Sequence, residues 1–408
     1  MLVVQKYGGS SVANKERIFN VAGRIAEAYD KGNSVVVVLS AQGDTTDELI
    51  EKAKEINPSA SRREMDMLLS TGEQQSVALM AMALEKMGYP AISLNAMQVG
   101  IDTTKAHSNA KIKTISTGRI YEELERKNIV IITGFQGVNQ YEDITTLGRG
   151  GSDTTAVAIA AALGADICEI YTDVDGVYTA DPRVVKDARK LDEISYSEMA
   201  ELASLGAKVL HTRSVELAQK YKVELVVRSS LTRDPGTVVK EETAVEKMLV
   251  SGVASDKDIA RVSIEGIKDE PGSAFVVFSL LEKKNVSVDI IIQSIGRDHT
   301  NDISFTIAKS DLPLAREVLD QNLALIGAQK VSYDESVAKV SIVGAGMATH
   351  PGVAKLMFEA LYDAGVNIGM ISTSEIKISV LIDEKDVENA VRAIHDKFDL
   401  ASQSMRKN

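Results

Sequence analysis

Short, almost continuously apolar runs alternate with longer amphipathic stretches over the first 230 residues of the chain. Strands are predicted at Leu2–Lys6, Val35–Ser40, Ile129–Gly134, Ile167–Thr172 and Glu224–Ser229, and helices at Asn14–Tyr29, Arg63–Met87, Ser152–Leu163 and Tyr196–Tyr221. Apolar strands of this kind are typical of a sheet covered on both faces, and their alternation with helices is typical of a parallel sheet. The sequence therefore predicts an α/β domain that binds its ligands at the carboxyl ends of the strands.

The C-terminal part of the chain contains an internal repeat. Arg261–Ile264 matches Lys339–Ile342 78 residues later, and Ile303–Phe305 matches Ile378–Val380 75 residues later. Each copy reads strand, helix, strand, strand, helix, which indicates two ferredoxin-like βαββαβ domains. The second copy lacks a last strand, and we expect the strand-like segment Met248–Ala254 to take that place. The predicted division is an α/β domain at 1–240, a linker with the extra strand at 241–260, and repeats at 261–335 and 336–408.

The composition narrows the class of protein. The 408 residues include 46 basic and 58 acidic side chains, for a net charge of −12, and 44% of them are apolar. An acidic chain without a basic block argues against nucleic acid and anionic membranes as partners. A single cysteine, Cys168, excludes an internal disulfide, and no histidine pair has metal-ligand spacing, so no resident metal is predicted. Neither a signal peptide nor a membrane span is found, and we expect a cytoplasmic protein.

A pair of glycines follows the first predicted strand, in Lys6-Tyr7-Gly8-Gly9-Ser10. Backbone N–H groups at such glycines can approach phosphate, and the start of the next helix adds a favourable partial charge. Lys6 can place a cation on a transferring phosphoryl group. The same segment fits a plain strand-to-helix turn, and both interpretations stay open here. The P-loop pattern does not occur in the sequence, which excludes a P-loop enzyme.

Residues 145–155 have the strongest functional signal. They contain three glycines around Arg149 and lead into a helix that begins Ser152-Asp153-Thr154-Thr155. Arg149 can hold a carboxylate through two parallel hydrogen bonds, and Asp153 lies in the first helical turn, where negative charge is stabilised. Capping by Ser152 or Asp153 explains the helix start, but neither Arg149 nor the glycines. We therefore interpret this segment as a substrate site.

Three further polar features accompany these segments. Residues 172–183 follow another predicted strand and end in Arg183. They can bind a nucleotide or can simply form a turn-rich loop. They lack the EF-hand spacing of a calcium site. Lys208 suits either a ligand or a solvated helix face. Glu73 is an isolated acid in an apolar helix, and its role stays open because a carboxylate near a helix start can simply complement the helix dipole.

Together these motifs resemble those of the aspartate kinase family, in the same order along nearly the whole chain. The motifs are Lys6–Ser10, Ser40 with Thr45-Thr46-Asp47-Glu48, Glu64-Met65-Asp66, Thr71-Gly72-Glu73, Gly134–Gly137, Gly148–Thr155, Asp173–Arg183 and Gly206–Leu210. The two repeats resemble ACT domains. The resemblance implies an amino-acid-kinase fold followed by two ACT domains. It also implies transfer of the ATP γ-phosphoryl group to the β-carboxylate of L-aspartate, the first step toward lysine, threonine and methionine.

The same resemblance implies a role for each motif. Lys6 would stabilise the transferring phosphoryl group, and Asp153 would orient Lys6 or the substrate. The aspartate site would consist of Ser40, Thr45, Thr46, Glu73, Arg149, Gly150, Gly151 and Ser152. The ATP site would consist of Lys6, Tyr7, Gly8, Gly9, Ser10, Thr172, Asp173, Tyr178, Asp181, Arg183 and Lys208. Mg²⁺ is expected with ATP, bound mainly by phosphates and water. A carboxylate acceptor is ionised at neutral pH and needs no general base.

The ACT resemblance implies control and assembly. Lysine, alone or with threonine, is expected to inhibit by binding at the turn that opens the first repeat's helix. Its contacts would be Asp269, Pro271, Gly272, Ser273, Ala274 and Gln293, with Val366, Asn367, Ile368, Ser374 and Glu375 closing the pocket across an interface. The edges of two small sheets favour a homodimer or larger assembly through the ACT repeats. A separately translated regulatory subunit is a further partner known among relatives.

Two alternative functions stay open on the sequence. One is an amino-acid-binding sensor with a silent kinase domain, against which the intact Lys6, Arg149 and Asp153 argue. The other is a related kinase for glutamate, acetylglutamate or a nucleoside monophosphate, against which the tandem ACT repeats and the context of Glu73 argue. Release of ADP in the presence of aspartate distinguishes the sensor from the kinase.

Overall fold

The computed structural model describes residues 1–205, 209–241, 249–295, 300–345, 347, 350 and 352–402. The chain forms two compact units. The N-terminal unit contains Met1–Tyr178, Lys190–Ser204 and Lys208–Glu246, and the C-terminal unit contains Thr179–Arg189, Leu205–Ala207 and Lys247–Asn408. Residues 179–189 thus belong to the C-terminal unit, although the chain on both sides of them belongs to the N-terminal unit.

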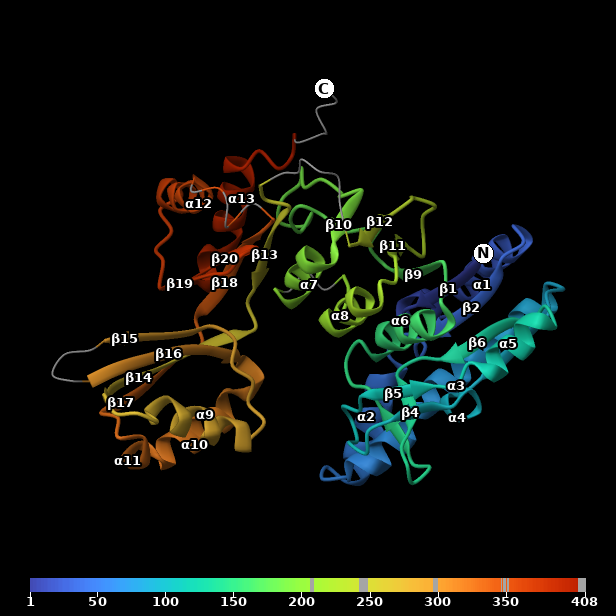
Figure 1. Ribbon diagram of the computed structural model, residues 1–408, viewed down its shortest axis with the longest axis horizontal. Coiled ribbons are helices and arrows are strands. Elements are labelled where there is room, and N and C mark those ends of the chain that lie inside the picture. Colours follow the sequence, from blue (N-terminus) through green and yellow to red (C-terminus); the bar gives the residue numbers. More distant parts are fainter. Residues whose placement is uncertain are drawn as a thin grey trace. The chain divides into compact units, whose positions relative to one another are not determined.

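An eight-stranded sheet organises the N-terminal unit (Figure 1), and its strand order is β10-β12-β11-β9-β1-β2-β6-β3. The strands are β1 (Leu2–Tyr7), β2 (Ser34–Leu39), β3 (Ala91–Leu94), β6 (Ile129–Thr133), β9 (Ile167–Thr172), β10 (Glu193–Ser195), β11 (Leu225–Ser229) and β12 (Thr237–Lys240). Among the described strands of this sheet, only β11 and β12 pair in antiparallel fashion. The predicted parallel α/β sheet is therefore confirmed, and the five predicted strands end within one residue of the observed ones.

Helices cover both faces of this sheet. α1 (Lys15–Asp30) and α3 (Arg62–Lys86) pack on one face, and α6 (Gly151–Leu163) packs on the other beside α8 (Thr212–Tyr221). Tyr7, Val35 and Val37 belong to the core beneath α1 and α3. Because side chains alternate along a strand, Lys6 points to the opposite face, where α6 lies.

The predicted helix over 196–221 is wrong as a single element. It is two helices, α7 (Tyr196–Ser204) and α8, and the chain is extended at His211, with φ −84° and ψ 132°, immediately before α8 begins. Several short elements of this unit escaped prediction. They are η1 (Gly9–Val12), α2 (Thr45–Ile56), α4 (Ala96–Val99), α5 (Gly118–Glu125) and a small sheet of order β5-β4-β7-β8, with β4 (Ile101–Thr103), β5 (Ile112–Ile115), β7 (Gln136–Val138) and β8 (Ile144–Thr146).

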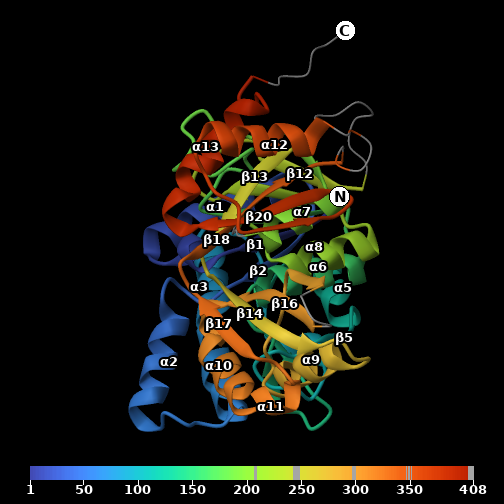
Figure 2. The same ribbon diagram turned by 90° about the vertical axis from the view of Figure 1, so that its left-hand side faces the viewer.

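The C-terminal unit contains two four-stranded sheets, each covered by helices (Figures 1 and 2). The first repeat consists of β14 (Ile259–Lys268), α9 (Ser273–Lys283), β15 (Ile291–Ile295), β16 (Thr300–Ala308), η2 (Lys309–Asp311), α10 (Leu312–Gln321), α11 (Leu323–Ile326) and β17 (Lys330–Asp334). The second consists of β18 (Val337–Val343), α12 (Gly352–Asp363), β19 (Met370–Thr373), β20 (Lys377–Asp383), η3 (Glu384–Asp386) and α13 (Val387–Lys397). Figure 2 shows α12 and α13 side by side over their sheet.

The strand β13 (Gly252–Asp256) completes the second sheet from outside the repeat. It pairs antiparallel with β18, from Gly252 opposite Val343 to Asp256 opposite Lys339. The two sheet orders, β15-β16-β14-β17 and β19-β20-β18-β13, give β13 the place that β17 has in the first repeat. An unpaired strand edge at β18 is thereby covered, which removes a site for unwanted strand pairing.

None of the described helices combines the length and the apolar character that a membrane span requires.

Candidate active site

Four adjacent strands of the main sheet, in the order β9-β1-β2-β6, end at one edge. Their parallel register places Tyr7 beside Leu39 and Tyr171, and Leu39 beside Thr133. The residues that follow these strands are therefore brought together, although they are far apart in the sequence. The residues at this edge are Lys6 near the end of β1, Gly8 and Gly9 after it, Ser40 after β2 and Thr172 at the end of β9. Ligands of parallel sheets bind at such an edge.

Lys6 and Asp153 form an ion pair at this edge. Lys6 Nζ lies 2.6 Å from Asp153 Oδ1, and the two side chains are only 11% and 12% exposed. Asp153 is the third residue of α6, so the ammonium group and the amide groups of the helix start lie in the same region. Both contribute positive potential, which suits an anionic ligand. Asp153, on α6, thus fixes the direction in which the Lys6 side chain points from β1.

The glycine turn beside Lys6 is tightly packed. A Cβ atom at Gly9 would lie 2.6 Å from the carbonyl oxygen of Ala41, and the Gly9 carbonyl accepts a hydrogen bond from the Gly43 N–H at 3.0 Å. A side chain at Gly9 would therefore push apart the loops after β1 and β2. A Cβ atom at Gly8 would lie 3.5 Å from Lys6 Nζ, which shows how closely the main chain of this turn borders the ammonium group.

The side chain of Tyr7 does not lie at the ligand edge. It is completely buried, and its ring stacks on Tyr171 with centroids 4.6 Å apart and an interplanar angle of 8°. The interpretation of Tyr7 as a nucleotide contact is thus wrong for its side chain. Its carbonyl group still borders the edge, where it accepts a hydrogen bond from the Ser40 N–H at 3.1 Å.

Glu73 reaches the same edge from the middle of α3. Its carboxylate accepts hydrogen bonds from the Ala41 N–H at 3.2 Å and from Gln136 Nε2 at 3.4 Å. The helix can approach this closely because residue 72 is glycine, where a Cβ atom would lie 2.8 Å from the Ala41 Cβ. Glu73 is 3% exposed, and burial raises its pKa to about 7, while these hydrogen bonds act in the opposite direction.

The structure also corrects one interpretation of Glu73. α3 begins at Arg62, about three helical turns before Glu73. The influence of a helix dipole on a side chain is confined to the first and last turns. Glu73 therefore does not serve to complement the dipole of α3, and a buried carboxylate with two hydrogen-bond donors at a ligand edge is a candidate for contact with a cationic group.

Arg149 is exposed and has no hydrogen-bond or ion-pair partner within the described part of the chain. The loop that carries it is nevertheless well anchored. Asp66, which is fully buried, accepts hydrogen bonds from the Thr146 N–H at 3.0 Å and from Thr146 Oγ1 at 2.7 Å. Arg213 donates to the Leu147 carbonyl at 3.1 Å. A fixed loop with an uncommitted guanidinium group suits the recognition of a carboxylate.

Asp66 and Arg213 anchor this loop, although the sequence assigned neither a role; Asp66 was named only as part of the motif Glu64-Met65-Asp66. Asp66 also accepts a hydrogen bond from the Ser108 N–H at 3.0 Å, so one carboxylate ties α3 to two other segments. An acid inside the apolar pattern of a helix was the available signal, the same signal that drew attention to Glu73. Gln136, which donates to Glu73, is 2% exposed; it lies within the named motif Gly134–Gly137, but its contact with Glu73 was not predicted.

Ser152 and Thr45 pack beside the same loops, because Ser152 Oγ would lie 2.5 Å from a Cβ atom at Gly134 and Thr45 Cγ2 would lie 3.5 Å from one at Gly72. Ser152 is 7% exposed at the start of α6, and Thr45 and Thr46 begin α2. Tyr178 donates a hydrogen bond to Asp175 Oδ1 at 2.8 Å, and burial together with this carboxylate raises the pKa of Tyr178 to about 12. Thr172 donates to Asp173 at 2.9 Å.

Two predicted nucleotide contacts belong to the C-terminal unit, and a third is not among the described residues. Asp181 and Arg183 belong to the C-terminal unit, where they form an ion pair of 2.7 Å with each other. The paired Arg183 lowers the pKa of the Asp181 carboxyl group. Lys208 lies outside the described residues.

The predicted effector residues of the first repeat form an exposed turn. Asp269 Oδ1 accepts a hydrogen bond from Asn301 Nδ2 at 2.7 Å. Gly272, with φ 102°, precedes α9, and Ser273 Oγ donates to the Lys268 carbonyl at 2.9 Å. Gln293 is exposed on β15, and Pro271 and Ala274 flank the start of α9.

In the second repeat, Val366 is 7% exposed and belongs to the core, so its side chain is not available to an effector. Ile368 packs partly against the same core. Asn367, Ser374 and Glu375 are exposed on the connections that flank β19.

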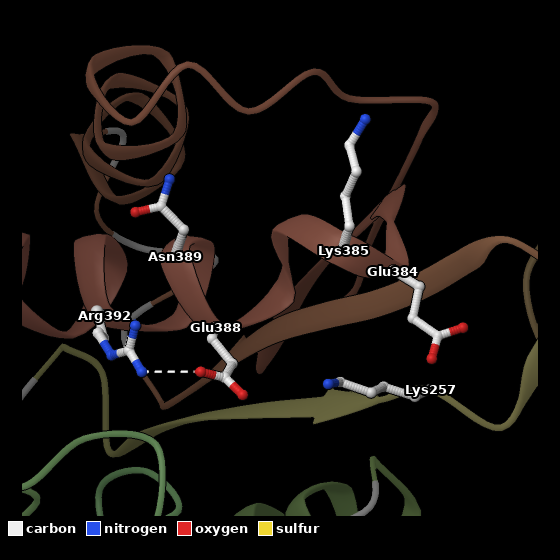
Figure 3. A pocket seen from close by; sticks show the side chains of 6 residues that line it. All are labelled: Lys257, Glu384, Lys385, Glu388, Asn389 and Arg392. Atoms are coloured by element: carbon white, nitrogen blue, oxygen red, sulfur yellow. Dashed lines mark hydrogen bonds and ion pairs between the residues drawn. The ribbon is translucent and has the colours of Figure 1, made fainter.

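A separate pocket of about 510 Å³ lies on the C-terminal unit (Figure 3). Its lining residues are Lys257, Glu384, Lys385, Glu388, Asn389 and Arg392. Both signs of charge occur there, and Arg392 and Glu388 pair at 2.8 Å. None of these residues has a predicted role in the reaction or its control, so the pocket is not the candidate active site.

Known proteins share both parts of this architecture. Residues 1–229 match the amino acid kinase family, and residues 262–323 and 340–398 match the ACT domain. Fold and site together define a kinase of the amino acid kinase family that carries a pair of ACT domains. The aspartokinase of Corynebacterium glutamicum is 52% identical to this chain, and the similarity covers 98% of this chain and 97% of that protein.

Two solved structures show the same relationship. The crystal structure of E. coli aspartokinase III in complex with aspartate and ADP (R-state) has a TM-score of 0.83 and 27% identity, and covers 97% of this chain and 99% of that one. The complex of the same enzyme with lysine and aspartate (T-state) has a TM-score of 0.78 at the same identity and coverage. The chain belongs to the aspartokinase family, and the predicted amino-acid-kinase fold with tandem ACT domains is confirmed.

Proposed function

We propose that this enzyme transfers the γ-phosphoryl group of ATP to the β-carboxylate of L-aspartate, giving ADP and 4-phospho-L-aspartate. The observation that carries the proposal is the Lys6–Asp153 pair, 2.6 Å long, beside the packed glycine turn. Support comes from the E. coli relative, whose crystal structure contains aspartate and ADP. The product would begin the synthesis of lysine, threonine and methionine.

Phosphoryl transfer depends mainly on positioning and on neutralising charge at the transferring oxygens. In this proposal Lys6 stabilises the transferring group, Asp153 orients Lys6, and the main chain at Gly8, Gly9 and Ser10 borders the phosphates. The acceptor is a carboxylate, which is already ionised at neutral pH, so the reaction needs no general base.

The residues at this edge fit Mg²⁺ that is carried by the nucleotide. Within the described part of the N-terminal unit, no group of three metal-ligating side chains comes together. Mg²⁺ commonly keeps several waters and binds through substrate phosphates. When bound, it would neutralise negative charge on the phosphate oxygens.

Recognition of aspartate requires a cation for its carboxylate and an anion for its ammonium group. Arg149 supplies the uncommitted guanidinium group, and Glu73 supplies the buried carboxylate. The hydroxyl groups of Ser40, Thr45, Thr46 and Ser152 would complete the pocket, and Gly150 and Gly151 would let the substrate approach the main chain. Thr172, Asp173 and Tyr178 would border the nucleotide, whereas Asp181, Arg183 and Lys208 stay predictions from the resemblance.

A substrate panel tests the proposed reaction. ADP release is measured with aspartate, glutamate, N-acetylglutamate and a nucleoside monophosphate as acceptors, each with and without lysine and threonine. The proposal expects release with aspartate only. Release with another acceptor and not with aspartate would assign the chain to a different kinase activity, and no release with any acceptor would favour the sensor alternative.

The raised pKa of Glu73 predicts a pH dependence. A carboxylate of pKa about 7 loses its charge as the pH falls through that value, and with it the attraction for the substrate ammonium group. We therefore expect kcat/KM for aspartate to fall on the acid side of pH 7, since this ratio reports the pKa values of the free enzyme. Glu73→Gln should remove this inflection, whereas Glu85→Gln, an exposed change on the same helix, should retain it. An inflection that persists in Glu73→Gln would assign it to another group.

We further propose feedback inhibition by lysine, alone or with threonine, through the turn at Asp269. An effector must bind the inactive arrangement more tightly than the active one in order to inhibit. The start of α9 suits the effector's carboxylate, and the exposed Asp269 suits its ammonium group. The E. coli relative has been crystallised with lysine.

Replacing Asp269 with alanine should weaken inhibition by about tenfold or more, because one charge-assisted contact is worth about 1.5–3 kcal/mol. The uninhibited kcat should stay nearly unchanged. Glu270→Ala, an exposed acid one residue away, is the matched control. Wild-type inhibition curves in the Asp269 variant, for both amino acids singly and together, would remove this turn from the effector site.

Assembly through the ACT repeats is proposed as well. β15 and β19 are edge strands of their sheets, and β15 ends in Ile295, which is 90% exposed. Phe275, on the neighbouring α9, is 75% exposed. Exposed apolar residues at an open strand edge favour pairing with another chain. Light scattering should therefore give at least a dimer, and a monomer would contradict the proposal.

A further inference from the structure

Three side chains converge beside α13 in the C-terminal unit. His395 and Asp396 lie on this helix, and Asp187 lies in the segment 179–189. One potential ligand atom from each residue lies within 4.8 Å of the other two. His395 is fully buried, whereas both aspartates are exposed. The cluster therefore combines a rigid imidazole group with two carboxylates that can adjust their positions.

The two ring nitrogens of His395 have different surroundings. Nε2 forms a hydrogen bond of 3.0 Å with Thr179 Oγ1, which also accepts a hydrogen bond from the Arg189 N–H at 2.9 Å. Nδ1 faces the acidic side, 4.0 Å from Asp396 Oδ1, which is too far for a hydrogen bond. Among the described residues, Nδ1 has no hydrogen-bond partner at all.

A buried nitrogen without a partner is unfavourable, and buried polar groups of this kind are uncommon in folded proteins. If Nε2 carries the proton, a lone pair on Nδ1 faces two negative charges, which adds electrostatic repulsion. A cation between Nδ1 and the carboxylates would remove both costs. Burial lowers the pKa of His395 against the influence of Asp187 and Asp396, which favours the neutral imidazole that coordinates metals.

We propose that Asp187, His395 and Asp396 bind a divalent transition-metal ion of the Zn²⁺ or Mn²⁺ class. One imidazole nitrogen and two carboxylate oxygens are a ligand set that such ions accept, with water completing the coordination on the exposed side. The hydrogen bond between Nε2 and Thr179 Oγ1 is the kind of outer contact that commonly orients a metal-binding histidine. Mg²⁺ is expected to bind poorly because it prefers oxygen ligands.

The ion would join two segments that already pack together. Arg392, labelled in Figure 3, donates a hydrogen bond through Nε to the Val184 carbonyl at 3.0 Å. Ala180 and Val185 are buried in the core of the second repeat, and the Thr179 carbonyl accepts a hydrogen bond from the Val253 N–H at 2.7 Å. A bound ion would add a direct link from residue 187 to α13. Metal binding should therefore raise the melting temperature and slow hydrogen exchange in residues 179–189.

The test uses the full-length protein after removal of metal with a chelator and of the chelator by dialysis. Binding of Zn²⁺ and of Mn²⁺ is measured by calorimetry for the wild type, Asp187→Asn and Asp396→Asn, with Mg²⁺ in parallel. We expect Kd to rise at least tenfold in both variants. Asp399→Asn is the matched control, because it removes the same charge three residues from Asp396 and asparagine tolerates the local φ of 51°. Its Kd should equal that of the wild type.

Both aspartates are exposed, so their asparagine variants should fold, and their melting temperatures without metal verify this. A second measurement does not depend on variants at those positions. Nitrogen NMR of the five histidine side chains, with His395 assigned from His395→Gln, should show a Zn²⁺-dependent shift of Nδ1 in His395. The proposal is overturned if the wild type shows no binding below millimolar Zn²⁺, if both asparagine variants bind like the wild type, or if the His395 signal does not respond.

Discussion

Replacing Lys6 with alanine is expected to lower kcat by about 10²–10³-fold, the usual effect of removing one electrostatic stabiliser of a transition state. The Lys6 side chain is only 11% exposed and its ammonium group is held by Asp153 at 2.6 Å, so solvent cannot substitute for it well. KM for aspartate should change much less, because the contact proposed for Lys6 is with the phosphoryl group rather than with the amino acid. Steady-state kinetics with both substrates varied measure the two effects separately.

Two controls accompany this variant. Lys15→Ala removes an exposed lysine at the start of α1 and should leave the kinetics unchanged. Circular dichroism establishes that the Lys6 variant is folded, which is a necessary control because Asp153 loses its partner in a largely buried position. Turnover within a few-fold of the wild type in a folded Lys6→Ala enzyme would exclude Lys6 from the mechanism.

Replacing Arg149 with alanine should raise KM for aspartate by about 10²-fold, while kcat changes little. A bidentate contact between arginine and a carboxylate contains two charge-assisted hydrogen bonds, and losing both costs about 2–3 kcal/mol. The fold should tolerate the change, since Arg149 is exposed and makes no hydrogen bond or ion pair with the described part of the protein. Arg149→Lys should restore little of the affinity, because an ammonium group cannot make the paired contact.

Arg62→Ala serves as the matched control, because it removes an exposed arginine at the start of α3. Its KM values should match those of the wild type. An Arg149 variant with an unchanged KM for aspartate and a raised KM for ATP would show that the glycine-rich loop serves the nucleotide instead.

The sequence was sufficient for the framework of the N-terminal unit because its strands are buried on both faces. All five residues of β6 are buried, and such a strand needs an unbroken apolar run that is easily recognised. Strands of three or four residues are too short to show such a run. β3, β10 and β12 escaped prediction for this reason, and so did the small sheet that carries Gln136.

The site was only partly visible in the sequence. Lys6, Asp153 and Arg149 could be named because glycines and helix-start residues surround them. The placement of Glu73 at this edge depends on Gly72 and on its contacts with Ala41 and Gln136, which lie on other elements. Contacts between residues far apart in the sequence cannot be predicted from a local pattern, because that pattern does not indicate which loop a helix will approach.

The sequence by itself determined the order of domains, the parallel sheet, the tandem repeat and the cation and glycines of the first turn, because periodicity and turn chemistry are local properties. The tertiary structure decided which of these residues meet. The Tyr7 ring is buried against Tyr171, and Asp187 lies close to His395 although the two residues are far apart in the sequence. Side-chain burial and the pKa values that follow from it depend on packing between distant segments, which the order of residues along the chain does not display.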